Sequence, residues 1–222
     1  TIDLSPGWNM ISMPGYPLET DPATLQTADI SLILPLYRWN PTAFSYEAVT
    51  ELKFAEGYWV LTINPEGTTL EIAVNSANSY DRPLQPGWNM IGGVSQAADF
   101  SNPQDEPDNS IIPGTLYSWN PTNFSYEAQT EIVPNQGYWV LTLAECQLTV
   151  GGEVSVPTAP QKLPQPEVMI SLNLSAGDWR QELELGMDQS ATDSLDQMDR
   201  ALPPVSYTHL RAHETDSYRV CR

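Results

Sequence analysis

The chain contains one sequence unit twice, at a constant offset of 80 residues. Three runs return almost unchanged: residues 6–11 as 86–91, residues 39–48 as 119–128, and residues 57–62 as 137–142. The repeated residues are aromatic, glycine, proline and asparagine side chains rather than a catalytic set. The duplication therefore predicts two copies of one fold, and not two copies of one reaction centre.

The repeated runs have the two-residue periodicity of β-strands. In residues 57–63, Trp59, Leu61 and Ile63 lie on one face and the intervening residues on the other. The turn residues 40–43, between the apolar runs 36–39 and 44–49, predict a hairpin, because proline fixes φ and the residue before it is extended. The expected fold class is all-β, with two tandem small β-barrel or sandwich repeats.

One short helix is expected in the first copy only. Asp21 would be its N-cap and Pro22 its first residue, in a helix that continues to about Ala28. The equivalent segment, residues 101–113, contains three prolines and cannot form that helix. The copies therefore differ most at residues 18–34 and 100–113, the loops where we expect partner contact.

The domain organisation follows from these patterns. Residues 1–76 and 77–155 are the expected repeat modules, and residues 156–166, with four prolines, an extended linker. Residues 167–204 begin with an alternating apolar run at 168–174, followed by a second candidate strand at 181–185. They predict the start of a truncated, immunoglobulin-like β-sandwich, which at about 40 residues cannot bury a core of its own.

The C-terminal residues 205–222 differ in kind from the rest. Residues 205–215 resemble one reading frame of a transposase-type sequencing adapter, and residues 220–222 resemble its continuation. We therefore expect an artefactual tail and leave it out of the functional interpretation. Because the chain starts with Thr1 just before a repeat, we expect a metagenomic protein fragment from which a signal peptide could have been lost.

Charge excludes several functions. Residues 1–204 contain 6 Lys and Arg against 26 Asp and Glu, a net charge of −20. Such a chain repels phosphate backbones and anionic membrane surfaces, so we expect no nucleic-acid partner. No apolar run approaches the roughly 18 residues of a membrane-spanning helix, so we expect no membrane insertion of this fragment. Cys146 is the single cysteine outside the tail and forms neither an intramolecular disulfide nor a cysteine-based zinc site. The low lysine and high Asp, Thr, Ser and Pro content suits an extracellular bacterial protein.

The aromatic residues have two interpretations. They could form a platform that stacks on sugar rings, or a core in which each ring buries on the order of 200 Å². The core interpretation is favoured for Trp8, Trp59, Trp88 and Trp139. The tyrosines remain open between the two, because they tolerate half-exposed positions. The candidate ligand-binding residues are Tyr37, Tyr46, Tyr117 and Tyr126.

Acidic residues supply the remaining candidates. Glu47 and Glu51 recur as Glu127 and Glu131, and a carboxylate pair could be the acid and base of a glycosidase, although duplication without catalysis explains the recurrence equally well. No catalytic residue is therefore assigned, and no cofactor is required. Calcium is the one ion with candidate ligands, although neither loop has calcium-loop spacing and a solvated acidic loop is favoured. The candidates are Asp105, Glu106, Asp108 and Asn109, and in a second loop Asp188, Asp193, Asp196 and Asp199.

The repeat motifs resemble modules of large bacterial secreted and cell-surface proteins. Those modules often begin Gly-Trp-Asn-Leu-Ile and end Gly-Tyr-Trp-Val, as residues 7–11 and 57–60 nearly do here. Residues 191–196 resemble the Ala-Thr-Asp-Gly-Phe-Asp signature of immunoglobulin-like domains near the C-termini of similar proteins, with Ser194 and Leu195 as departures. The resemblance implies all-β, extracellular, non-catalytic spacer or binding modules, some on carbohydrate-active proteins, and supplies no catalytic residues.

Taken together, these features predict a structural or adhesive repeat region that spaces or presents other domains of its parent protein at the cell surface. A carbohydrate-binding module, with extracellular glycans or cell-wall polymers as partners, is the alternative, and a glycoside-active enzyme domain is a distant third. A binding module predicts aromatic faces exposed in one plane, whereas a spacer predicts them buried.

Overall fold

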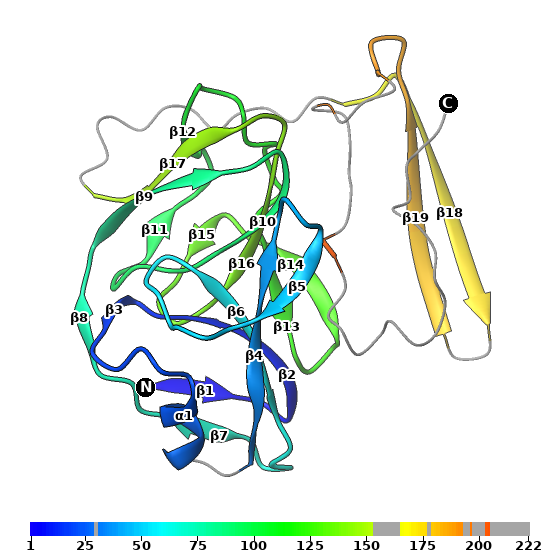
Figure 1. Ribbon diagram of the computed structural model, residues 1–222. Coiled ribbons are helices and arrows are strands. Elements are labelled where there is room, and N and C mark those ends of the chain that lie inside the picture. Colours follow the sequence, from blue (N-terminus) through cyan, green and yellow to red (C-terminus); the bar gives the residue numbers. More distant parts are fainter. Residues whose placement is uncertain (29–30, 153–164, 177–178, 193–195, 197–202, 205–222) are drawn as a thin grey trace.

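The computed structural model describes residues 1–28, 31–152, 165–176, 179–192, 196 and 203–204. The expected artefactual tail, and the expected linker apart from residues 165–166, lie outside them. The described chain is nearly all β, which confirms the expected fold class (Figure 1). No helix among the described residues is long and apolar enough to span a membrane.

The strands of the first copy are β1 (Ile2–Leu4), β2 (Gly7–Ser12), β3 (Gly15–Pro17), β4 (Leu32–Asn40), β5 (Ser45–Ala48), β6 (Gly57–Thr62), β7 (Thr68–Leu70) and β8 (Val74–Ser76). Those of the second copy are β9 (Ser79–Leu84), β10 (Gly87–Ile91), β11 (Ala98–Asp99), β12 (Gln104–Glu106), β13 (Tyr117–Asn120), β14 (Ser125–Ala128), β15 (Glu131–Ile132), β16 (Tyr138–Thr142) and β17 (Cys146–Gly151). A separate hairpin consists of β18 (Val168–Ala176) and β19 (Trp179–Met187).

Each copy builds the same antiparallel four-stranded sheet. The order is β2-β6-β4-β5 in the first copy and β10-β16-β13-β14 in the second. The registers agree across the offset, since Met10 pairs with Trp59 in the first sheet and Met90 with Trp139 in the second. The predicted hairpin is confirmed in both copies, with Trp39 opposite Tyr46 and Trp119 opposite Tyr126.

The duplicated Pro-Gly-Trp-Asn run forms a closed turn before the first sheet strand. Gly7 and Gly87 have φ values of +92° and +94°, a region that glycine enters without a side-chain clash. The side chain of Asn9 accepts from the Ser5 amide at 2.9 Å and donates to the Ser5 carbonyl at 2.7 Å. Asn89 makes the same two bonds to Gln85, so this asparagine recurs because it holds the turn.

The duplicated Gly-Tyr-Trp run is also explained by structure. The Tyr58 hydroxyl accepts a hydrogen bond from the Lys53 amide at 2.7 Å, and the Tyr138 hydroxyl one from the Val133 amide at 2.8 Å. A Cβ at Gly57 would lie 2.8 Å from the Ile91 carbonyl oxygen of the second copy. Its counterpart Gly137 meets the Ile11 carbonyl oxygen at the same distance, so both glycines allow one copy to approach the other.

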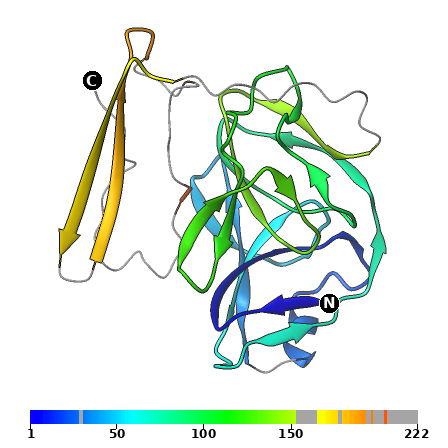
Figure 2. The same ribbon diagram turned by 180° about the vertical axis from the view of Figure 1, so that it is seen from behind.

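The two copies are joined by reciprocal backbone contacts. Ile11 forms a β-bridge with Gln136, and Ile91 forms the equivalent bridge with Glu56. The Gly92 amide donates to the Ala55 carbonyl at 3.0 Å. Figures 1 and 2 show the first copy, in blue and cyan, lying against the second, in green, in one continuous body. The module boundaries at 76 and 77 remain a prediction.

The tryptophans of the central strands lie between the two sheets. Trp59 and Trp139 are almost fully buried, in a core that continues into the second copy. Their rings meet the other copy edge to face, Trp59 with Trp119 at 5.5 Å and Trp139 with Trp39 at 5.6 Å between centroids. Trp8 and Trp88 are only half-buried, at the edge of this core. The first copy has a second core behind its sheet, around Leu32, Leu36 and Tyr58.

The segments between the repeated strands differ, as expected. The first copy contains α1 (Ala23–Ala28), whose Ala23 amide donates to the Asp21 side chain at 2.9 Å, so the predicted cap is confirmed. The second copy places β11 and β12 there instead. The alternating apolar run Leu70, Ile72, Val74 divides between β7 and β8, which join different sheets.

The β18–β19 hairpin confirms the predicted strand at 168–174 and stands apart from the repeat body in both views (Figures 1 and 2). Val168, Ile170, Leu172 and Leu174 are each at least 40% exposed. A two-stranded ribbon buries little of its own apolar surface. That it begins a truncated immunoglobulin-like domain remains a prediction.

Candidate functional site

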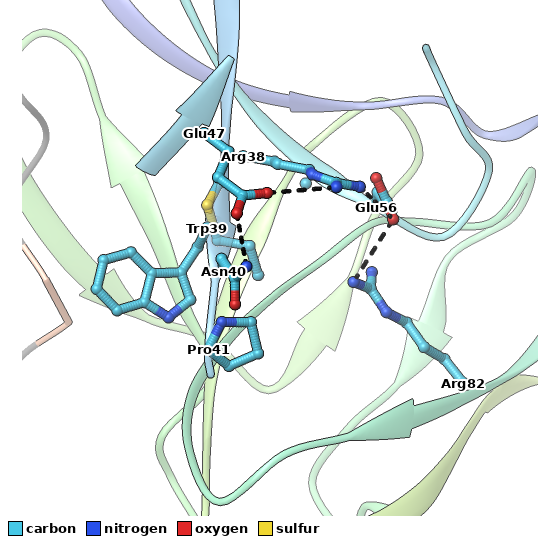
Figure 3. A pocket seen from close by; sticks show the side chains of 9 residues that line it. Arg38, Trp39, Asn40, Pro41, Glu47, Glu56 and Arg82 are labelled. Atoms are coloured by element: carbon cyan, nitrogen blue, oxygen red, sulfur yellow. Dashed lines mark hydrogen bonds and ion pairs between the residues drawn. The ribbon is translucent and has the colours of Figure 1, made fainter. Parts of the chain in front are cut away.

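A cavity of about 200 Å³ lies where the first hairpin meets the second copy. Strands β4 and β5 supply Arg38, Asn40 and Glu47. Glu56 directly precedes β6, and the second copy supplies Arg82 and Met90. Figure 3 shows the guanidinium groups of Arg38 and Arg82 directed at Glu56, with the Trp39 indole on the opposite side. The lining residues are Arg38, Trp39, Asn40, Pro41, Glu47, Glu56, Gly57, Arg82 and Met90.

The charges in this cavity form a chain of ion pairs. Arg38 lies 3.4 Å from a Glu47 oxygen and 3.6 Å from a Glu56 oxygen, and Arg82 lies 4.0 Å from Glu56. Arg82 also donates to the Ala55 carbonyl. Asn40 Nδ2 donates to Glu47 at 2.6 Å. Two cations and two anions balance, so the cavity is locally neutral in a strongly acidic chain.

The second copy repeats the hairpin with Glu127 but without counterparts of the Arg38 and Glu56 charges. Ser118 stands at the position of Arg38, and Gln136 at that of Glu56. Asn120 still donates to Glu127 at 2.6 Å, and Ser118 Oγ accepts a hydrogen bond from Gln129 at 2.9 Å. The Asn–Glu contact is therefore part of the hairpin architecture in both copies, whereas the arginine pairs of the described chain form only around the first hairpin.

The duplicated acids do not form an isolated carboxylate pair. Glu47 is held by Arg38 and Asn40, while Glu51 lies 3.4 Å from Lys53. In the second copy Glu131 lies on β15 rather than beside the Glu127 hairpin. Both histidines of the chain lie at 209 and 213, outside the described residues. The structural contacts of Glu47 and Glu127 explain why they recur.

The four candidate tyrosines separate into two kinds of position, all half-buried. Tyr37 packs against Trp8 at 6.2 Å, and Tyr117 against Trp88 at 6.0 Å, each within its own copy. The other two lie on the hairpins, Tyr46 at 5.1 Å from Trp39 and Tyr126 at 5.2 Å from Trp119. The tilted and edge-to-face geometries do not make one flat aromatic plane.

The hairpin tyrosines lie in an environment of low polarity. Burial raises the pKa of Tyr46 and of Tyr126 far above the ordinary tyrosine value, and the nearby Tyr126 hydroxyl raises that of Tyr46 further. The indole N–H of Trp59 opposes the rise at Tyr46, and that of Trp139 the rise at Tyr126, although neither meets hydrogen-bond geometry within the described part of the chain. Both phenols therefore remain protonated donors.

The first group of calcium candidates has other partners. Asp105 Oδ2 accepts from the Ser110 amide at 2.7 Å and the Ile111 amide at 3.0 Å, and so closes its own loop. Burial raises the pKa of this carboxyl above its usual value. Glu106 and Asp108 are exposed. Over the described ranges, no three His, Cys, Asp or Glu side chains gather as a metal-holding group.

The second group is only partly described. Asp188 accepts hydrogen bonds from the Ser190 amide and hydroxyl, which lower the pKa of its carboxyl, and Asp196 accepts from Thr192. Asp193 and Asp199 lie outside the described residues. Elsewhere, Cys146 is buried, and burial together with the nearby Asp105 carboxylate raises the pKa of its thiol to about 11.

Comparison with known proteins gives no match: no protein-family description, no characterised protein and no solved structure is detectably similar to this chain. Sequence reasoning did not identify Arg38, Glu56 and Arg82 as cavity residues. The available signal was the loss of symmetry, because Arg38 and Glu56 are charged in one copy and neutral in the other.

Proposed function

We propose that the chain is a non-catalytic structural or adhesive repeat region of a secreted or cell-surface bacterial protein, which spaces or presents other domains. The observation that carries the proposal is that the repeated residues stabilise the fold and the contact between the two copies. Asn9, Tyr58 and their counterparts hold turns, and Gly57 and Trp59 with theirs hold the copies together. A unit selected for this role needs rigidity rather than a reactive group.

Two further features support the same proposal. The charged groups of the cavity are mutually paired, which leaves no activated acid or base between them. The strongly acidic composition, with a net charge of −20 over residues 1–204, keeps such a chain soluble and disfavours nucleic-acid partners. Secretion and a bacterial source come from the composition and from the resemblance of the repeat motifs.

A carbohydrate-binding module remains the second candidate, and the cavity of Figure 3 is the observation that favours it. Planar polar side chains beside an indole are suited to a sugar, since Arg, Asn and Glu can bond hydroxyl groups while the ring covers an apolar sugar face. The site would then lie at Arg38, Asn40 and Arg82 rather than on the four tyrosines first considered.

Affinity electrophoresis of the full chain against soluble and insoluble glycans distinguishes the two. The structural proposal expects no retardation on any glycan. Retardation that is lost in an Arg38→Ser and Glu56→Gln variant, which copies the neutral corner of the second repeat, would replace it by the carbohydrate-binding function. Turnover of a glycoside that disappears in Glu47→Gln with Glu127→Gln would instead support an enzyme.

A further inference from the structure

The hydroxyl groups of Tyr46 and Tyr126 converge on one atom. Tyr46 donates to the Pro204 carbonyl oxygen at 3.2 Å, and Tyr126 donates to the same oxygen at 2.6 Å. These tyrosines occupy equivalent positions of the two copies, so each copy contributes one hydroxyl donor to the same acceptor. A carbonyl oxygen has two lone pairs and can accept both hydrogen bonds.

The walls around this contact are aromatic and come from both copies. Trp39 and Trp119 lie against the two tyrosines at 5.1 and 5.2 Å, and the buried Trp139 lies 6.4 Å from Tyr46. Pro203 is buried and Pro204 half-buried. The short orange-red segment near residue 204 lies beside β5 and β14 in Figure 1, away from the β18–β19 hairpin.

Proline suits such a site for a physical reason. When a residue packs into an apolar surface, a backbone N–H left without an acceptor weakens the binding. Proline has no backbone N–H, so it avoids this cost. Two consecutive prolines therefore leave only carbonyl oxygens, and the tyrosine pair supplies donors for one of them. Aromatic grooves that hold extended proline segments use the same combination of ring packing and hydroxyl donors.

We propose that Tyr46 and Tyr126, with Trp39 and Trp119, form a binding site for an extended diproline segment, and that the chain fills it with its own Pro203–Pro204. The site exists only when the two copies are joined, because each contributes one tyrosine. It goes beyond a spacer function and does not depend on it. The contact attaches Pro203–Pro204 to the repeat body at a fixed point.

The primary test is nuclear Overhauser spectroscopy on the full chain, with tyrosine and proline labelled. We expect contacts from Pro204 to both rings, Tyr46 and Tyr126. Removal of both hydroxyls in Tyr46→Phe with Tyr126→Phe should lower the docking equilibrium constant roughly tenfold or more, since two partly buried hydrogen bonds are lost. Tyr16→Phe, which removes an exposed hydroxyl elsewhere, should change nothing.

A second variant tests the preference for proline. Pro203→Ala with Pro204→Ala should abolish the contacts, while unchanged amide shifts in β6 and β16 show that the repeat body remains folded. Contacts absent from the wild-type chain, or retained in the alanine variant, would overturn the proposal. Displacement of Pro204 from the two tyrosines by a soluble oligosaccharide would also overturn the proposal, because the site would then bind a sugar in preference to the diproline segment.

Discussion

The two copies have nearly the same strands but different corners where they meet. Around the first hairpin, Arg38 and Glu56 join Arg82 in a chain of ion pairs, whereas Ser118 and Gln136 leave the second corner neutral. The aromatic contacts are reciprocal, Trp59 with Trp119 and Trp139 with Trp39. The difference indicates that the two copies share the aromatic joint between them, formed by Trp39, Trp59, Trp119 and Trp139, whereas the arginine ion pairs of the described chain occur at the first hairpin only.

The largest effects should come from the buried tryptophans of the joint. Trp59→Ala and Trp139→Ala should each lower the free energy of unfolding by about 3–5 kcal/mol, because each removes a large ring from a shared core. Urea denaturation followed by circular dichroism measures both. Phe44→Ala and Phe124→Ala, which change exposed rings at equivalent positions, are the controls and should stay within about 0.5 kcal/mol. Unequal effects of the two tryptophan variants would contradict the symmetry of the joint.

The next largest losses of stability should come from the glycines at which the backbones of the two copies approach each other. Gly57→Ala and Gly137→Ala should each cost about 1–3 kcal/mol, because the new Cβ would lie 2.8 Å from a carbonyl oxygen of the other copy. The amide resonance of Gly92, which bonds Ala55, should shift in the first variant. In the control Gly7→Ala, the new Cβ would have no atom within 4 Å and would be strained only by the positive φ. This variant should therefore leave the Gly92 resonance unchanged. No destabilisation in either contact variant would mean that the copies are not held this closely.

Tyr58→Phe and Tyr138→Phe should each cost about 1–2 kcal/mol, because each leaves a backbone amide without its acceptor. Thermal or urea unfolding at neutral pH measures the loss in each copy. Tyr16→Phe is the matched control, since its ring is 61% exposed. A cost in one copy only would show that the hydroxyl contact is not a shared feature of the repeats.

Alkaline pH tests the same tyrosines. Burial raises the pKa of Tyr138 to about 12, whereas an unfolded tyrosine titrates near about 10. The folded state retains a proton that the unfolded state loses, so this contribution to stability is complete below pH 10 and disappears as pH rises through 12. The free energy of unfolding should therefore fall less steeply between these values in Tyr138→Phe. An unchanged slope would contradict burial of the phenol.

The smallest effect is expected at the charged corner. Arg38→Ser with Glu56→Gln, which gives the first copy the neutral residues of the second, should change stability by less than about 1 kcal/mol because the ion pairs are partly exposed. The reciprocal change, Ser118→Arg with Gln136→Glu, is the matched control. Urea denaturation at low and high salt measures both, and a loss above about 2 kcal/mol would show that the corner is structural.

The sequence alone predicted the elements that local chemistry determines. Two-residue periodicity predicted the strands around Trp59 and Trp139, Asn-Pro-Thr predicted the hairpins, and Asp21-Pro22 predicted the cap of α1. The fully buried positions of Trp59 and Trp139 agreed with the core interpretation. Trp8 and Trp88 pack against the same core but are only half-buried, because alternation gives the face of a strand and not its depth in a sheet.

Contacts between the copies could not be predicted in this way. Periodicity reports only neighbours along the chain, so it did not show that Gly57 meets Ile91 or that Arg82 reaches Glu56. Tyr46 and Tyr126 were candidate binding residues, but their convergence on one carbonyl oxygen could not be predicted, because it depends on how the two sheets pack. Arg82 lies outside the repeated runs and was not distinguished from other surface charges.

The central claim, that the two copies form one cooperative unit through a shared aromatic joint, is tested most directly by native-state amide hydrogen exchange. The slowest-exchanging amides of β6 and β16 should have the same free energy of opening. That free energy should decrease with the same dependence on urea in both strands, and should decrease in both strands together in Trp59→Phe. Loss of protection confined to β6 in that variant, with β16 unchanged, would contradict it.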